Sequence, residues 1–308
     1  MKNVLVLGGS GMLGSMLVDY LSRHSDFSLT ATVRSAALRA RMQTVYPQVR
    51  WEIADFAAAR SPETFAAFDG QEWIANAIGI TKPLIRDDNP AEILTAIHIN
   101  SLLPDAIARE AQARHAQVLQ IATDCVYSGV KGSYLETDVH DAVDVYGKTK
   151  SLGECFLSNT RHLRCSIIGP EPKDYKFLIE WFRRQAPQAA VNGFVNHYWN
   201  GVTTLHFAKI CKGIIETAPA FSHLQHVVPS SLITKARMLR DFADAYGRPD
   251  IAIRDIEAKT VIDRTLDTVN PAANLALWQS AGYPHPPTVT EMILELGKYG
   301  YQLDSARA

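Results

Sequence analysis

The sequence predicts an α/β fold with a Rossmann-type, doubly wound parallel sheet and a smaller C-terminal α/β lobe. Short β-branched segments alternate with helical patterns through the first half of the chain, as in parallel sheets covered by helices on both faces. A glycine-rich turn directly follows the first of these segments. Beyond Gly169-Pro170 the alternation loosens, and a second lobe is expected to begin there.

The first domain is expected to span residues 1–170. Apolar residues recur every three or four positions over 12–23 and 91–114, which is the periodicity of amphipathic helices. The segments between and after these helices are short and rich in Val, Ile and Leu, as buried strands are. The predicted strands are 3–7, 29–33, 50–54, 73–77, 118–122 and 162–168.

The smaller lobe is expected to span residues 171–308. Helical patterns occur around 177–185, 205–216 and 235–246, and a Pro cluster precedes a last helix. An apolar segment within 221–229 is predicted to return to the first sheet as one more strand. The two domains would then be interleaved rather than separated at a single boundary.

Composition and charge exclude several classes of function. The 308 residues carry a net charge of −1, so no global positive field exists to hold nucleic acid or an anionic membrane. Apolar residues make up 47% of the chain, in runs shorter than the ~20 residues of a membrane span. The four cysteines form no C-x-x-C pair, which argues against structural zinc and disulfides. We expect a cytoplasmic protein, and the sequence contains no acidic cluster to which a metal would be assigned.

The glycine-rich turn has the features of a dinucleotide-binding site. Its glycines lie between a predicted strand and the start of a predicted helix. One glycine permits a tight turn, another permits close approach of backbone to a pyrophosphate, and a third permits close packing of helix on strand. The helix N-terminus offers unpaired amides to the anion. The residues expected to contact the cofactor are Gly8, Ser10, Gly11, Met12, Leu13 and Gly14.

The end of the second predicted strand indicates which dinucleotide binds. An acidic residue there would bind the ribose diol of NAD, whereas an arginine would accept the 2′-phosphate of NADP. The residue is Arg34, so the sequence favours NADP, with NAD still possible; alternatively, Arg34 is a solvated side chain. Asp55 is placed to meet the adenine edge or to cap a turn. The cofactor would also pass Asn76, Ala77 and Ile78, at the end of the fourth strand.

Tyr146 and Lys150 have the spacing of a catalytic pair. They are four residues apart and therefore share one face of a helix. A cation close to a phenol favours the phenolate, so that proton exchange with a carbonyl or an alcohol becomes possible. Thr123, at the end of the fifth strand, could donate a hydrogen bond to the same oxygen. Alone, the Y-x-x-x-K pattern is common on helical surfaces, and the dinucleotide motif is what favours the catalytic interpretation.

Four segments, taken together, resemble the extended short-chain dehydrogenases/reductases, and within them the dTDP-4-dehydrorhamnose reductase branch. Residues 122–129, ATDCVYSG, resemble S-T-D-x-V-F-D-G, and residues 132–138, GSYLETD, resemble G-x-Y-x-E-x-D. Residues 146–154, YGKTKSLGE, are similar to Y-G-x-S-K-x-x-G-E, and residues 264–268, RTLDT, are similar to R-x-L-D-T. The resemblance spans nearly the whole chain.

This resemblance implies an NADP(H)-dependent reductase that converts the 4-keto group of a nucleotide-linked 6-deoxyhexose to an alcohol, in deoxysugar and cell-surface polysaccharide biosynthesis. Thr123, Tyr146 and Lys150 would form the catalytic group, and Lys150 would also hold the nicotinamide ribose. Ile167 would lie beside the nicotinamide, and Asn100 falls where many members of the superfamily have a structural or proton-relay asparagine. The partner would be a nucleotide-diphosphate sugar, and a homodimer is a possible assembly.

Two other functions remain open on the sequence. An NAD-dependent nucleotide-sugar epimerase or dehydratase on the same fold would need further acid or base groups beside Thr123, where Asp124 supplies a carboxylate. A non-catalytic NADP-binding regulatory subunit is the other alternative, since relatives of the rhamnose reductases serve as the regulatory subunit of methionine adenosyltransferase.

The residues expected to contact the substrate lie mostly in the second lobe. An aromatic side chain there could stack on a base or a sugar face, although a core Trp and a hydrogen-bonded His explain the same residues. Arg264 could contact substrate or pair with a neighbouring carboxylate, and Asp124 could orient substrate or bond local amides. The residues assigned to the substrate are Asp124, Asn196, His197, Trp199 and Arg264.

Other charged residues and a cysteine near the motifs have weaker interpretations. A basic group on the 173–184 stretch could meet a diphosphate, but solvated charges on an open helix face explain it as well. Cys125 lacks a paired histidine and is interpreted as a small apolar filler. The basic residues concerned are Lys173, Lys176, Arg183 and Arg184.

Overall fold

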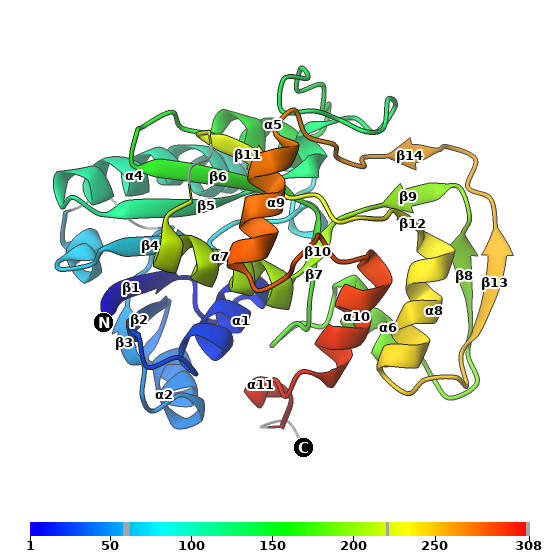
Figure 1. The fold of residues 1–308 in the computed structure, drawn as a ribbon, viewed down its shortest axis with the longest axis horizontal. Helices are drawn as coiled ribbons and strands as arrows, with labels where there is room; N and C mark the ends of the chain where they lie inside the picture. The colour runs from blue at the N-terminus through cyan, green and yellow to red at the C-terminus, as the bar shows by residue number, and fades with distance from the viewer. Residues whose placement is uncertain (58–61, 220–221, 306–308) are drawn as a thin grey trace.

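The computed structural model describes residues 1–57, 62–219 and 222–305, and a seven-stranded parallel sheet lies at its centre. The strand order is β11-β6-β5-β4-β1-β2-β3. Figure 1 shows this sheet on one side of the molecule and a smaller group of strands and helices on the other. The predicted α/β, Rossmann-type class is confirmed. The strands are β1 (Lys2–Leu7), β2 (Phe27–Val33), β3 (Arg50–Ile53), β4 (Trp73–Asn76), β5 (Gln117–Thr123), β6 (Thr160–Cys165) and β11 (Leu224–His226).

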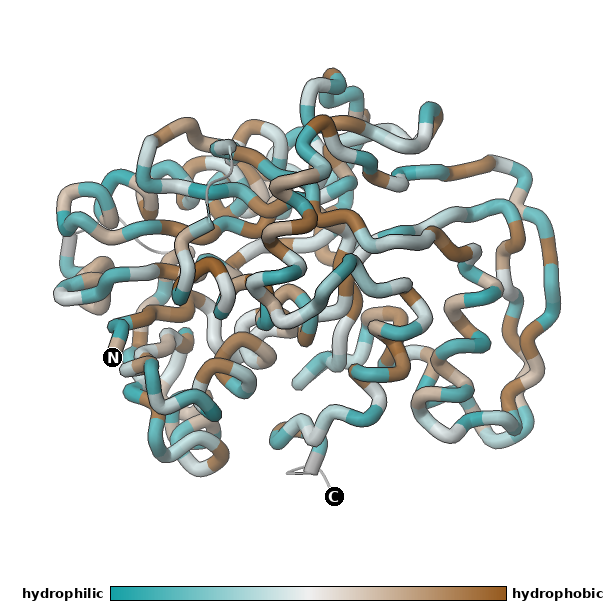
Figure 2. Tube along the Cα trace, in the orientation of Figure 1, coloured by the Kyte–Doolittle hydropathy of each residue, from teal (hydrophilic) through white to brown (hydrophobic). Residues whose placement is uncertain are grey.

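Apolar side chains alternate between two layers along the central strands. Val4 and Val6 of β1 pack in the layer that holds α1 (Met12–Leu21) and α7 (Thr204–Thr217). Leu5 and Leu7 pack in the opposite layer, with η1 (Pro62–Phe68) and α4 (Leu103–Ala113). Figure 2 shows brown, hydrophobic stretches along these strands. Helices therefore cover both faces of the sheet, which is why its strands are apolar on both sides. A helix that the sequence did not predict, α2 (Ala36–Val45), follows β2.

The predicted helix 91–114 consists of three joined segments. α3 (Pro90–Ile97) runs into a π-helical turn, η3 (His98–Leu102), which runs into α4. Such π turns are frequent at functional sites. This one packs against α5 (Val145–Leu152), and a Cβ on Gly153 would lie 1.9 Å from the carbonyl oxygen of Asn100. Glycine is therefore needed where α5 ends against the π turn.

The prediction of one strand over 162–168 is wrong. β6 ends at Cys165, and β7 (Ile167–Ile168) pairs with β10 (Val202–Thr203) in a separate two-stranded sheet. The amide of Val202 donates to the carbonyl of Ser166, at 2.9 Å. From Ser166 onward the backbone therefore bonds to β10 of the second lobe, and the chain leaves the central sheet there.

The second lobe contains small sheets and helices that the sequence marks only in part. β8 (Ala190–Phe194) pairs with β13 (Ala252–Ile256), and β9 (His197–Trp199) lies between β12 (Ile233–Thr234) and β14 (Ile262–Asp263). Figure 1 shows α8 beside β8 and β13, with α10 nearby. The helices are α6 (Leu178–Arg183), α8 (Lys235–Ala245), α9 (Pro271–Ser280), α10 (Val289–Lys298) and α11 (Gln302–Ser305), and the 3₁₀ turns η2 (Lys82–Leu84) and η4 (Asp124–Val126) lie in the first half.

The segment expected to return to the first sheet contains β11, which lies at the sheet edge next to β6. Position 221 of that segment, and the end of the lobe at 306–308, lie outside the described residues. The division into domains at 170 stays a prediction. Across the described ranges, no helix is both long and apolar enough to cross a membrane.

Candidate active site

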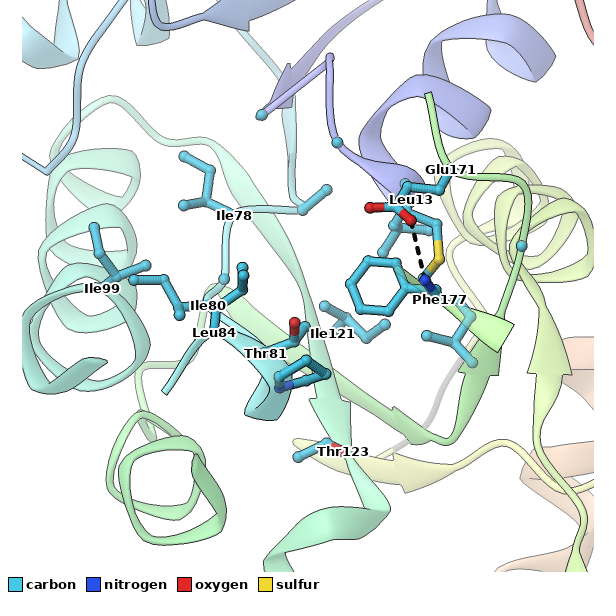
Figure 3. A pocket seen from close by; sticks show the side chains of 18 of the residues that line it. Leu13, Ile78, Ile80, Thr81, Leu84, Ile99, Ile121, Thr123, Glu171 and Phe177 are labelled. Carbon is cyan, nitrogen blue, oxygen red and sulfur yellow. Dashed lines mark hydrogen bonds between the residues drawn. The ribbon is translucent and has the colours of Figure 1, made fainter. Parts of the chain in front are cut away.

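A cavity of about 660 Å³ lies where the carboxyl ends of the parallel strands face the second lobe. In open α/β sheets, ligands bind in this crevice. Its walls combine the glycine-rich turn, the ends of β2, β4 and β5, the first turns of α5 and residues 165–179. Figure 3 shows side chains from these elements around it, including Leu13, Ile78, Ile121, Thr123 and Phe177. The cavity therefore joins the two regions that the sequence marked for cofactor and substrate.

The glycine-rich turn is shaped by close backbone contacts. Gly8 has a φ of +75°, which L side chains rarely adopt, and its carbonyl accepts the amide of Gly11 at 3.0 Å. A Cβ on Gly14 would lie 2.1 Å from the Gly8 carbonyl oxygen. α1 starts at Met12 without a side-chain cap, so its first amides have no side-chain acceptor. This is the arrangement that suits a pyrophosphate.

The other expected cofactor contacts fall into two groups. Arg34 and Asp55 line the cavity, where Arg34 is exposed and Asp55 accepts the amide of Ala57 at 3.0 Å. Ala77 and Ile78 also line it, and so does Ile167 beyond β6. Asn76 is buried behind the wall, where it donates to Gln120 at 2.7 Å and accepts the amide of Ile78 at 3.0 Å. Asn76 therefore shapes the loop after β4. Gly14 allows α1 to pack closely against the glycine turn.

Tyr146 is positioned by the capping and packing of α5. Asp144 caps the helix by accepting the amide of Gly147 at 2.8 Å, and it also pairs with Lys82 at 2.7 Å. A Cβ on Gly147 would lie 2.4 Å from the carbonyl oxygen of Cys125. Only glycine allows α5 to approach η4 this closely, and this approach brings Tyr146 beside Thr123.

The three predicted catalytic residues lie together in the cavity wall. Tyr146 and Thr123 are close enough for the Thr123 side chain to act on the pKa of the phenol, and the ammonium of Lys150 donates to the carbonyl of Ile121 at 3.2 Å. Burial raises the pKa of Tyr146, which the Thr123 side chain opposes only in part. Burial also lowers the pKa of Lys150 to about 8. Desolvation therefore dominates and keeps the phenol of Tyr146 protonated, and the expected effect of Lys150 on the phenolate stays a prediction.

Asn100 holds the floor of the cavity from the π turn. Its side-chain amide donates to the carbonyl of Ile80 and its side-chain oxygen accepts the amide of Ile80, both at 2.9 Å. The same amide lies 3.3 Å from the hydroxyl of Thr149 on α5. Asn100 therefore ties the loop after β4 to the helix that carries Tyr146 and Lys150.

The structure brings only some of the predicted substrate residues to the cavity. Trp199 and Asp124 line it, and the indole N–H of Trp199 donates to Ser166 at 2.8 Å. Asn196 exchanges hydrogen bonds with the backbone of Ala258, at 2.8 and 2.9 Å. Through these contacts Asn196 joins its own segment to the segment that contains Ala258.

Two other predicted substrate residues contact backbone carbonyls. The His197 ring lies 2.9 Å from the carbonyl of Thr260, and Arg264 donates to the carbonyl of Tyr127 at 2.8 Å. Asn196, His197 and Arg264 are absent from the described cavity wall. The assignment of all five residues to the substrate stays a prediction. The positions of Trp199 and Asp124 in the cavity wall support it for these two residues.

The other basic residues named from the sequence differ in whether they reach the cavity. Lys173 and Lys176 line the cavity, whereas Arg183 pairs with Glu180 at 3.0 Å and with Asp304 at 3.2 Å, and Arg184 lies 3.6 Å from Glu180. Burial raises the pKa of Cys125 to about 12, so its thiol stays protonated and fits the filler interpretation. Across the described parts of the chain, no group of three or more His, Cys, Asp or Glu residues could hold a metal ion.

The wall residues that sequence reasoning missed include two charged ones, Glu171 and Lys235. Glu171 is buried and accepts the amides of Lys176 and Phe177, at 2.6 and 3.1 Å, so it folds the 171–177 segment over the cavity (Figure 3). Lys235, the first residue of α8, reaches the cavity from the second lobe. Neither belongs to a motif, and only the fold brings them next to the glycine turn and β5.

The fold and the cavity define an extended short-chain dehydrogenase/reductase. The model of the RmlD substrate binding domain family matches residues 1–168. The chain belongs to this family, which is the rhamnose reductase branch that its motifs resemble.

Three individual proteins illustrate the similarity. The chain is 22% identical over 272 residues to methionine adenosyltransferase 2 subunit beta of Bos taurus, covering 85% of this chain and 77% of that protein. It spans about half the length of some other curated relatives that it matches. The dTDP-4-dehydrorhamnose reductase of Bacillus anthracis in complex with NADP superposes with a TM-score of 0.71 at 15% identity, over 96% and 99% of the two chains. The UDP-glucuronic acid 4-epimerase of Bacillus cereus, in complex with UDP-glucuronic acid and NAD, superposes with a TM-score of 0.74 at 13% identity, over 100% of both.

Proposed function

We propose that the protein is an NADP(H)-dependent reductase of a nucleotide-linked 4-keto-6-deoxyhexose. The observation that carries this proposal is the convergence of Thr123, Tyr146 and Lys150 in the wall of the cavity that begins at the glycine turn. Membership in the RmlD family supports it, and so does the likeness to a reductase whose structure contains NADP.

The residues present fit a dinucleotide. Gly8 and Gly11 leave room for a pyrophosphate at the start of α1, and Lys150 is placed to hold the nicotinamide ribose. Arg34, exposed at the end of β2, suits a 2′-phosphate, and this is the reason to favour NADP over NAD. When bound, such a cofactor supplies the hydride, and the protein contributes orientation and electrostatics.

The protein supplies the proton. The raised pKa of Tyr146 keeps its phenol protonated, so it can donate to the substrate oxygen as negative charge develops there. Thr123, beside Tyr146 in the cavity wall, would donate to or orient the same oxygen. Lys150, whose pKa burial lowers to about 8, can remain cationic near neutral pH and stabilise the phenolate that Tyr146 becomes.

A Tyr146→Phe variant tests this proposal. General acid catalysis contributes roughly 10²- to 10⁴-fold, so we expect kcat for 4-keto-sugar reduction to fall by that factor while the Kd for NADPH stays unchanged. A Tyr198→Phe variant, which alters an exposed tyrosine of β9, is the matched control and should keep full activity. Reduction at the wild-type rate by Tyr146→Phe would reject the proposal.

Two observations keep the other functions in view. Burial raises the pKa of Asp124 beside Thr123, which places a perturbed carboxyl where an epimerase or dehydratase needs an acid or base, and the Bacillus cereus epimerase shares the fold. Copurified NAD and turnover without added NADPH would favour that enzyme.

The likeness to the methionine adenosyltransferase subunit supports a regulatory role instead. Failure of every keto-sugar, together with a stable partner complex, would favour the subunit.

A further inference from the structure

Lys235 presents a partly buried ammonium group to the cavity. It is the first residue of α8, which Thr234 caps by accepting the amide of Arg237 at 3.2 Å. Its side chain lies over the indole ring of Trp199, with the ammonium 5.6 Å from the ring centroid. Both residues line the cavity wall that faces β5. The cation therefore belongs to the second lobe but opens onto the site.

Three features make this ammonium unfavourable in the protein alone. Partial burial removes much of its water, and this desolvation is the main cause that lowers the pKa of Lys235 to about 8. A cation at a helix N-terminus opposes the helix dipole. Within the described residues, no carboxylate lies within ion-pair distance of it and no hydrogen-bond acceptor is seen. An anion at this position would relieve all three costs at once.

Asp124, the acidic residue with the largest electrostatic effect on Lys235, does not act as this anion. Asp124 attracts Lys235, but Asp124 is itself buried with a raised pKa, and its carboxyl oxygen accepts the hydroxyl of Thr123 at 3.2 Å. Arg264 also acts electrostatically on Asp124. Two cations thus share one desolvated carboxyl, so Asp124 offsets the charge of Lys235 only in part.

The corner is separate from the expected pyrophosphate position of the cofactor. Lys235 interacts with Asp124 and Cys125, which directly follow β5, whereas the glycine turn follows β1. β5 lies two strand positions from β1 in the sheet, which corresponds to ~9–10 Å. An anion at Lys235 would therefore lie on the substrate side of the catalytic group.

We propose that Lys235 binds the diphosphate of the nucleotide-linked sugar and so fixes the sugar against Thr123 and Tyr146. This inference rests on the proposed function, because that function supplies a substrate with a diphosphate next to the sugar. Trp199 forms the apolar side of the same corner, and the N-terminus of α8 adds a favourable dipole for the anion. Lys235 would be a positioning residue of the substrate, distinct from the cofactor contacts at Arg34 and the glycine turn.

Calorimetric titration of the NADPH-saturated protein with UDP and with dTDP tests the inference. We expect Lys235→Met to weaken the preferred nucleoside diphosphate roughly 10- to 100-fold, the value of a charge-assisted contact, while Lys235→Arg stays within about threefold of wild type. Lys148→Met, which removes an exposed lysine of the same first-domain helix as Tyr146, should change nothing. The Kd for NADPH should be the same in all four proteins. Lys235→Gln gives a second neutral variant should Lys235→Met fold poorly.

Each other outcome has a definite meaning. Equal binding of the nucleoside diphosphate by wild type, Lys235→Met and Lys235→Gln overturns the inference and leaves the proposed function standing. Equal weakening of NADPH would make Lys235 a cofactor contact and also overturns it. A loss seen only with UDP-glucuronic acid, and not with UDP-glucose or UDP, would assign Lys235 to a sugar carboxylate instead. Failure of the wild type to bind either nucleoside diphosphate would reject the nucleotide-sugar substrate itself.

Discussion

Two groups of charged residues, one buried and one partly buried, are partnered in opposite ways in this molecule. The first surrounds Arg164, whose guanidinium contacts both carboxylate oxygens of Glu154 at 2.5 and 2.7 Å and the hydroxyl of Tyr127 at 2.6 Å. It also reaches ring nitrogens of His140 at 2.9 Å and His226 at 3.0 Å. The second group is the cavity wall, where Lys150 has a single backbone acceptor at 3.2 Å and Lys235 faces an aromatic ring.

The difference separates motif residues that build the fold from those that await a ligand. The Arg164 cluster joins β6 to the 127–140 segment and to β11, and it uses Glu154 from the YGKTKSLGE motif. A buried charge that is paired with an opposite charge holds elements together, and removing one partner leaves the other uncompensated. The cavity lysines carry the cost of burial without that compensation. We infer that ligand binding, rather than folding, explains their positions.

The largest effect expected from this comparison is on stability at Arg164. An Arg164→Met variant leaves Glu154 buried without its partner, so we expect the free energy of unfolding to fall by about 3–5 kcal/mol. Urea unfolding followed by circular dichroism measures it. The control, Arg109→Met, removes an exposed ion pair with Asp105 and should leave the unfolding curve nearly unchanged. Equal curves for the two variants would break the distinction between the groups.

A smaller effect is expected from acid. Burial lowers the pKa of His226 to about 4, and it lowers that of His140 too, relative to ~6.5 in an unfolded chain. Between pH ~6.5 and ~4 the unfolded chain therefore binds protons that the folded chain does not, and the free energy of unfolding decreases as pH falls. The contribution is complete above pH ~6.5. Urea unfolding at pH 7 and pH 5 should show this loss, and a His226→Gln variant should show less of it. A gain in stability at pH 5 would contradict this account of the cluster.

Much of the first domain and the catalytic group could be predicted from sequence. β1 to β5 follow from their apolar runs, and the glycine turn and the Tyr146–Lys150 spacing are local patterns whose geometry a strand, a turn or a helix fixes. Thr123 could be placed because the end of a parallel strand faces the crevice. The family resemblance supplied the function, and family membership confirms the branch.

The remaining features depend on contacts between distant parts of the chain. Strands such as β10 and β14 have two residues each, too few for any periodicity. The break at Ser166 arises from pairing with β10, and the π turn at Asn100 accompanies the close approach of Gly153. Lys235 belongs to an ordinary amphipathic helix, and nothing local distinguishes it from a solvated lysine. Its burial against Trp199 exists only in the folded molecule.

The account's central claim is that the cavity charges serve a ligand and the Arg164 cluster serves the fold, and thermal unfolding with and without NADPH tests it most directly. We predict that Lys150→Met unfolds near the wild-type temperature without ligand and loses most of the rise that NADPH produces, since a ligand stabilises only the state that binds it. Arg164→Met should unfold at a lower temperature yet keep that rise. The claim is contradicted if Lys150→Met loses as much ligand-free stability as Arg164→Met and still responds to NADPH as the wild type does.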